Sequence, residues 1–452
     1  MIIKGAIIVN EGLERVGDVL VRDGVIQQIS SSLDIIDDEI IDAHDCYLLP
    51  GIIDDHVHFR EPGLTSKADM HTESMAAVAG GVTSVLDMPN VVPQTTSYET
   101  WMQKMQLAEK QMHCNYGFFI GATNSNMDEI QRLPVEQYPG VKLFMGSSTG
   151  NMLVDRKESL MRIFRNSPKI IMAHCEDTAI INRNMQIARE QFGDDPDIIH
   201  HPAIRSREAC IASSSLAVKM ARETGARLHI AHISTAEELE LLETFDSQEN
   251  PIEARITGEA CVSHLIYTQE DYKRLGTRIK CNPAIKHNTD REALRRALTD
   301  GRIAVVGTDH APHLLVDKNG GARSAASGIP MIQFSLISML ELVSEGILTL
   351  TRLVELMCHN PAKLFGIQQR GFIREGMYAD LVLVKCTEPY RLTKDSILSK
   401  CGWSPRENDV FSWKVCKTYI SGNLVYNGTN VNTSFHGNPL LFTYNEYNGN
   451  YV

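Results

Sequence analysis

Two histidines separated by one residue, His56 and His58, follow an apolar run and precede Arg60 and a Pro-Gly turn. Successive side chains of a β-strand point to opposite faces, so the two imidazoles share one face. Arg60 shares that face too if the strand continues. Two imidazoles at a strand end can bind one metal ion from the same direction. Alone, the pattern fits equally well a strand in which histidines alternate with apolar residues.

The middle of the chain alternates β-branched runs with helical patterns. The predicted strands are 52–58, 82–88, 116–121, 141–145, 169–174, 227–232, 252–259 and 303–308, and the predicted helices include 97–112, 153–166, 206–224, 235–245 and 331–342. This alternation predicts an α/β fold, a (β/α)8 TIM barrel over residues 51–365. An open doubly wound sheet is the alternative, but no Gly-x-Gly-x-x-Gly turn follows the first strand.

In a barrel of this kind, functional residues gather at the carboxyl ends of the strands. The residues at or just past these ends are mostly metal-ligand or acid–base types: His56, His58, Asn90, Lys142, His174, His232 and Asp309. A free ammonium at Lys142 would repel divalent ions, whereas a buried lysine of lowered pKa can add carbon dioxide and become a carbamate. That carbamate could bridge two ions, one held by His56, His58 and Asp309, the other by His174 and His232. The alternative role for Lys142 is a structural ion pair.

Both ends of the chain are rich in short strand patterns. Residues 1–50 contain β-branched runs punctuated by turns, and a second strand-rich region returns within residues 366–452. These segments predict a small discontinuous β-sandwich domain that is built from both termini and accompanies the barrel.

Composition narrows the class of protein. A net charge of −12 over 452 residues argues against a nucleic-acid or acidic-membrane partner. No apolar run approaches the roughly 20 residues that span a bilayer, and the first residues lack the features of a signal peptide. The ten cysteines include no Cys-x-x-Cys pair, which is typical of reduced thiols in the cytoplasm. We therefore expect a cytoplasmic enzyme.

Two longer motifs resemble the signatures of class I dihydroorotases in the amidohydrolase superfamily. The first is Asp-His-Val-His-Phe-Arg-Glu-Pro-Gly at 55–63, and the second is Gly-Thr-Asp-His-Ala-Pro-His at 307–313, with Lys318 five positions on. Blocks around Asn90, His174, His232, Glu259 and Asn282 are similar to family blocks in the same order, so the likeness covers nearly the whole chain. Lys142 departs from those class I relatives that have aspartate there, and is similar to the lysine that other dihydroorotases and hydantoinases carry.

The resemblance implies an activity and a role for each site residue. The activity is the reversible cyclisation of N-carbamoyl-L-aspartate to L-dihydroorotate plus water, in de novo pyrimidine (UMP) synthesis, by a possible homo-oligomer. Two Zn²⁺ ions per subunit, bridged by carboxylated Lys142 and hydroxide, are the implied cofactors. The implied metal ligands are His56, His58, Lys142, His174, His232 and Asp309, and Asp309 also transfers the proton. The implied substrate contacts are Arg60, Asn90 and His313 on the carboxylate, with Asn282, Ser327 and Gly328 along the ring.

Two other functions compete. The same machinery could open another ring, as in an allantoinase or hydantoinase, or the chain could be a silent homologue that serves as an assembly partner. Arg60 favours a ring that carries a carboxylate, because its guanidinium offers a permanently charged bidentate fork. Its alternative role is a salt bridge with Glu61 or Asp69. Every ligand position is filled, which argues against a silent homologue.

Overall fold

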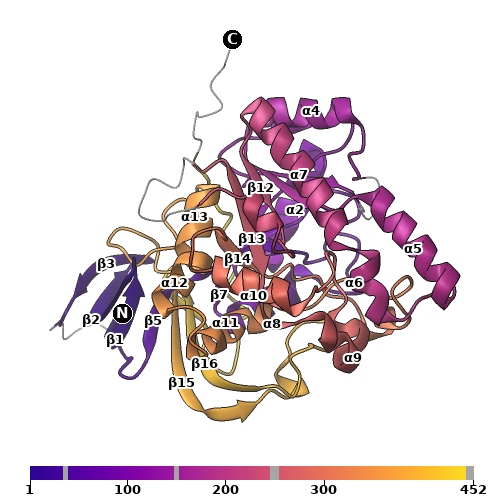
Figure 1. The fold of residues 1–452 in the computed structure, drawn as a ribbon. Coiled ribbons are helices and arrows are strands. Elements are labelled where there is room, and N and C mark those ends of the chain that lie inside the picture. The colour runs from indigo at the N-terminus through magenta and orange to yellow at the C-terminus, as the bar shows by residue number, and fades with distance from the viewer. Residues whose placement is uncertain (34–38, 147–151, 245–253, 444–452) are drawn as a thin grey trace.

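The computed structural model describes residues 1–33, 39–146, 152–244 and 254–443. Figure 1 shows its two parts: parallel strands surrounded by helices, and a sheet at one side that contains strands from both ends of the chain. None of the helices described combines the length and apolar character that crossing a membrane requires.

The middle of the chain forms two parallel sheets. One has the order β6-β7-β8 and the other the order β14-β13-β12-β11-β10-β9. Their bounds are β6 Ile52–Val57, β7 Val82–Asp87, β8 Asn115–Phe118, β9 Ile120–Gly121, β10 Val141–Met145, β11 Ile171–Cys175, β12 Leu228–Ile230, β13 Ile256–Cys261 and β14 Val305–Gly307. The start of the predicted strand 252–259 lies outside the described residues. An isolated parallel bridge pairs Val57 of β6 with His310, just past β14. The predicted α/β class with parallel strands is confirmed.

Helices connect and cover these strands. They are α1 Met70–Ala79, α2 Tyr98–Gln111, α3 Met127–Arg132, α4 Lys157–Asn166, α5 Thr178–Phe192, α6 His201–Ile204, α7 Arg207–Thr224, α8 Val262–Ile266, α9 Tyr272–Leu275, α10 Asn288–Ala297, α11 Ser335–Ser344, α12 Leu350–Val354 and α13 Asn360–Phe365. Local chemistry sets several ends: a capping box at Ser97 opens α2, and Gly225, with a left-handed φ of 74°, ends α7.

The predicted helix 235–245 is wrong in its described part, and Phe245 lies outside that part. A single 3-10 turn, η2, spans Glu238–Leu241, and the chain is already extended at Leu242. The buried Glu238 carboxylate accepts the backbone N–H groups of Ser234 and Thr235 at 3.3 and 3.2 Å. These tertiary constraints override the helical pattern of the sequence.

The two ends of the chain form one sheet of order β17-β16-β15-β5-β1-β2-β3, with β4 paired to β1. Its strands are β1 Ile2–Asn10, β2 Leu13–Arg22, β3 Val25–Ser30, β4 Ile40–Asp42, β5 Tyr47–Pro50, β15 Leu381–Arg391, β16 Val410–Ile420 and β17 Asn423–Tyr426. In Figure 1 the indigo and yellow strands of this sheet lie side by side, because β5 pairs antiparallel with β15. The sandwich and the division into domains stay predictions, and residues 444–452 of the second segment lie outside the described chain.

Candidate active site

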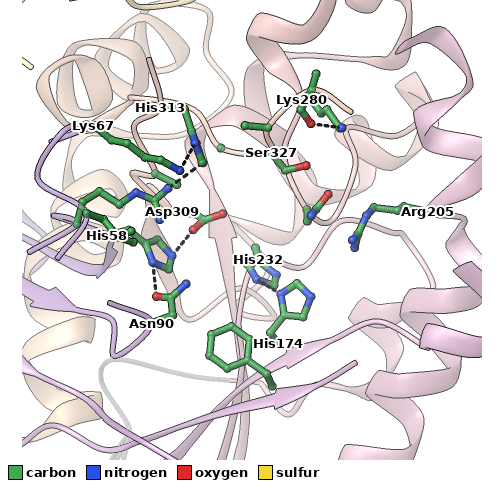
Figure 2. A pocket seen from close by; sticks show the side chains of 18 of the residues that line it. His58, Lys67, Asn90, His174, Arg205, His232, Lys280, Asp309, His313 and Ser327 are labelled. Atoms are coloured by element: carbon green, nitrogen blue, oxygen red, sulfur yellow. Dashed lines mark hydrogen bonds and ion pairs between the residues drawn. The ribbon is translucent and has the colours of Figure 1, made fainter. Parts of the chain in front are cut away.

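A cavity of about 940 Å³ lies where the parallel strands end. Every residue predicted for the site lines it, namely His56, His58, Arg60, Asn90, Lys142, His174, His232, Asn282, Asp309, His313, Ser327 and Gly328. Figure 2 shows these side chains converging, with His58 between Asn90 and Asp309 and with His174 beside His232. Side chains that are far apart in the sequence therefore meet in one cavity.

Two histidines, Asp309 and Lys142 form the first group in this cavity. The Nε2 atoms of His58 and His56 lie 3.0 and 3.4 Å from Asp309 Oδ1. The Lys142 ammonium nitrogen lies 3.3 Å from His56 Nε2. Burial lowers the pKa of both histidines and of Lys142. Burial would raise the pKa of Asp309, but His56 and His58 hold it well below its ordinary value.

His56, His58 and Asp309 offer ligand atoms that could together hold a metal ion. Nδ1 of His56 faces Glu259 at 3.2 Å and Nδ1 of His58 faces Asn90 Oδ1 at 2.8 Å, and both partners are acceptors. Each Nδ1 therefore carries the proton, and each neutral ring presents an Nε2 lone pair to a carboxylate oxygen. Lone pairs that face one another repel, whereas a divalent cation between them would bind the Nε2 atoms and the carboxylate oxygen together. Imidazole and carboxylate are ligands that Zn²⁺ accepts.

His174 and His232 form the second group. Nδ1 of His174 lies 2.9 Å from Nε2 of His232, and the His232 ring centroid is 5.4 Å from that of His56. Nδ1 of His232 is buried and has no hydrogen-bond partner among the described residues. The two groups are thus adjacent, with Lys142 beside His56 at their junction.

Three site residues have a strained backbone. Arg60, His232 and Asp309 adopt left-handed φ angles of 66°, 40° and 48°, which residues with a Cβ rarely adopt. Such strain persists only where surrounding structure enforces it, and it is common at functional sites. β6 ends at Val57 and does not continue to Arg60, so a turn rather than the strand brings the guanidinium to the cavity.

Arg60, His313 and Lys67 form a cationic wall. Arg60 donates from Nε to Pro312 O and from Nη2 to His313 Nε2, each at 3.1 Å, and Lys67 Nζ lies 3.1 Å from His313 Nδ1 (Figure 2). Burial, Arg60 and Lys67 lower the pKa of His313 to about 2, so its ring is neutral. Burial lowers the pKa of Arg60 only to about 10, so its charge is kept at neutral pH.

The residues predicted to contact the substrate ring also line the cavity. Oδ1 of Asn282 is buried and accepts no hydrogen bond from the described residues. Gly328 has a φ of 146°, and a Cβ there would lie 2.3 Å from Ala311 O and 2.9 Å from His313 Cδ2. Gly328 is therefore required for the close approach of its loop to His313.

No role was predicted for several residues that support the site. Glu259 accepts a hydrogen bond from His56 Nδ1, and a carboxylate in that position orients a metal-binding imidazole. Asp87 accepts the Phe59 N–H at 3.0 Å and pairs with Lys104 at 2.7 Å, which fixes the backbone between His58 and Arg60. The strands around Asp87 and Glu259 are buried throughout, so no alternation in the sequence marked these side chains.

Replacing Lys104 with methionine is expected to lower the free energy of unfolding by about 3–5 kcal/mol, because it leaves a fully buried Asp87 carboxylate without its cation. Urea denaturation measures the loss. The matched control is Lys219→Met, which removes an exposed lysine 3.9 Å from Glu223 and should leave the denaturation midpoint unchanged. Equal midpoints for both variants would contradict a structural role for the Asp87–Lys104 pair.

Comparisons with known proteins agree with this geometry. The model of the amidohydrolase family matches residues 47–425. A dihydroorotase of Methanosarcina acetivorans is 32% identical over 87% of this chain and 85% of its own length. An allantoinase of Bacillus velezensis is 29% identical over 94% of both. An L-hydantoinase (dihydropyrimidinase) structure from Arthrobacter aurescens superimposes with a TM-score of 0.91, at 26% identity, over 97% of this chain and 99% of that one.

The match to the family model extends from β5 to β17 and so includes every strand whose end lines the cavity. Over such a length, identity of about a third and a superposition of this quality do not arise from a shared fold class alone. The chain belongs to the amidohydrolase family.

Proposed function

We propose that the chain is a dihydroorotase, which interconverts N-carbamoyl-L-aspartate and L-dihydroorotate plus water, as a step of pyrimidine synthesis. The observation that carries the proposal is a buried arginine, Arg60, whose guanidinium lines the cavity beside the histidine–aspartate group. Membership in a family of metal-dependent hydrolases supplies the reaction class, and Arg60 selects the substrate within it.

Arg60 pairs with no carboxylate side chain among the described residues. Both salt bridges considered from the sequence are excluded: Glu61 accepts from Met70 N and Gln111 Nε2, and Asp69 pairs with Lys400 at 2.7 Å. A buried cation without a counter-ion is costly, and a substrate carboxylate would offset that cost. Lys67 adds a second positive charge beside His313, so an anionic substrate suits this wall in a protein of net charge −12.

Two Zn²⁺ ions would be held by His56, His58 and Asp309 and by His174 and His232, with Lys142 as a carbamate ligand. When bound, such ions activate a water molecule and polarise a carbonyl group. Burial favours the neutral amine of Lys142. This amine can attack carbon dioxide, form a C–N bond and release a proton, and the product is the carboxylate that would bridge the ions.

The chain's own residues orient the substrate and move the proton. Arg60, Asn90 and His313 hold the α-carboxylate, Asn282 and the backbone at Ser327 and Gly328 lie along the ring, and the scissile amide then faces Asp309. In ring opening, Asp309 takes a proton from the attacking water and gives it to the ring nitrogen as the C–N bond breaks. In cyclisation, which consumes one proton from solution, the ureido nitrogen attacks the side-chain carboxyl group in its protonated form and loses a proton to Asp309. Asp309 gives this proton to the departing hydroxyl group, which leaves as water.

We further infer that the parallel sheets close into a (β/α)8 barrel over residues 51–365, and that residues 1–50 and 366–452 form a separate β-sandwich domain. The bridge from Val57 to His310 and the direct succession of β8 and β9 support closure, as does the superposition on the hydantoinase. A homo-oligomer in the cytoplasm is expected from the resemblance.

Turnover of three rings by the purified protein tests the function. Dihydroorotate should be opened with a kcat/KM at least tenfold above that for allantoin or hydantoin, since only dihydroorotate carries the carboxylate that Arg60 would bind. A preference for allantoin or hydantoin would reject the dihydroorotase assignment and leave a cyclic amide hydrolase of another specificity. Absence of turnover for all three rings by protein that carries its metal would favour the silent homologue.

A further inference from the structure

The connection between β15 and β16, residues 392–409, reaches from the terminal sheet to the loops around the cavity. Within it, Ser399 donates to Glu73 Oε2 at 2.6 Å and the Lys400 backbone N–H donates to Glu73 Oε1 at 2.9 Å. Lys400 Nζ donates to Thr65 O at 2.6 Å, in the segment between Arg60 and α1. The tip of the connection is thus bound to the segment that carries Arg60 and Lys67.

Glu73 extends this contact towards the catalytic group. Its Oε2 lies 2.8 Å from His310 Nε2, and Nδ1 of His310 accepts the Met331 N–H at 3.1 Å. Nε2 of His310 therefore carries the proton and donates to Glu73. Since His310 follows Asp309 directly, the connection and Asp309 are linked through two buried side chains.

Trp403 is the centre of the contact between the connection and the loop that carries His313 and Lys318. Its side chain is 2% exposed, and its indole N–H donates to the backbone carbonyl of His313 at 2.8 Å. Its ring also lies under the Lys318 ammonium, 5.9 Å from the centroid. Lys318 donates to the carbonyls of Lys280, Ala326 and Gly328 at 3.1, 2.7 and 2.9 Å.

We propose that Trp403 is a positioning residue of the carboxylate-binding wall, and that the 392–409 connection is a structural part of the active site. The indole fixes the backbone of His313 next to Pro312, whose carbonyl accepts from Arg60. Through Lys318 the same ring supports the loop that carries Ser327 and Gly328. The inference rests on the proposed function only for the identity of the substrate, because the contacts hold for any ring that this cavity binds.

Trp403→Phe removes the N–H donor and keeps an aromatic ring under Lys318, and the control variant below matches the reduction in ring size. In the metal-loaded enzyme, KM for dihydroorotate should rise about fivefold, the loss expected for one hydrogen bond, while kcat changes less than twofold. Trp403→Leu also removes the ring beneath Lys318 and should raise KM further. The matched control is Trp413→Phe, which removes an indole N–H that donates to Ser344 Oγ at 2.8 Å, far from the cavity wall, and should leave both constants unchanged.

Amide hydrogen exchange gives a readout that does not depend on the substrate. In Trp403→Phe, amides of residues 311–328 should exchange faster than in the wild type or in Trp413→Phe. Faster exchange in a protein that does not open dihydroorotate would support the positioning role and reject only the proposed function. Unchanged exchange with an unchanged KM would overturn the proposal, and so would a fall in kcat with KM unchanged.

Discussion

Lys142→Ala is expected to lose bound metal and activity together. The wild type should carry about two divalent ions per chain, and the variant should lose at least one of them, with kcat/KM reduced about 10³-fold or more. The reason is that activation of water and polarisation of the carbonyl are worth several kcal/mol, and each 1.36 kcal/mol is a factor of ten in rate. Metal analysis of the dialysed protein and a dihydroorotate assay measure the two losses.

Two comparisons separate a bridging carbamate from a structural lysine. Lys169 is a second lysine whose pKa burial lowers, in its case to about 8. Unlike Lys142, it does not line the cavity. Lys169→Ala should therefore keep metal and activity. Acetate can occupy the space that Lys142→Ala opens and supply the missing carboxylate, so it should restore part of both. If Lys142 is only an ion-pair partner, a carboxylate cannot replace it and the variant should retain its metal.

The convergence of the predicted metal ligands in one cavity could be predicted from the sequence, because parallel strands meet at one edge and their carboxyl ends carry residue types that bind metals. His56, His58, His174, His232 and Asp309 could be brought together without any coordinates, since strand direction alone places their side chains at one mouth. Their separation along the chain, from 56 to 309, did not matter to that argument.

The supporting contacts could not be predicted in the same way. Trp403 lies 90 positions from His313, and Glu73 lies 237 positions from His310, so no local spacing joins them. The condition under which Arg60 would share the face of His58, a continuing strand, is not met, because β6 ends at Val57 and Arg60 has a left-handed φ of 66°. Lys67 is a polar residue in a loop, and only the folded chain shows that it faces His313.

Arg60→Gln is the prediction that tests the substrate. Glutamine keeps hydrogen-bonding capacity but removes the charge. The transition-state stabilisation that kcat/KM for dihydroorotate reports should therefore fall by about 2–5 kcal/mol, as when one partner of a buried charge pair is removed. This corresponds to roughly a 30-fold to 5000-fold loss. Arg60→Lys keeps the charge but not the bidentate fork, so its kcat/KM should lie between those of the wild type and Arg60→Gln. The control is Arg323→Gln, an exposed arginine that lines the same cavity and should have little effect.

A second ring makes the test specific. Hydantoin has no carboxylate, so whatever turnover the wild type gives with it should survive in Arg60→Gln, and the ratio of the two kcat/KM values should collapse. Arg60 also donates to Pro312 O, so the substitution could disturb the loop itself. In that case kcat/KM would fall by the same factor for dihydroorotate and for hydantoin, and the ratio of the two values would stay constant. The change in the ratio, rather than the loss of activity, therefore identifies Arg60 as the group that recognises the substrate carboxylate.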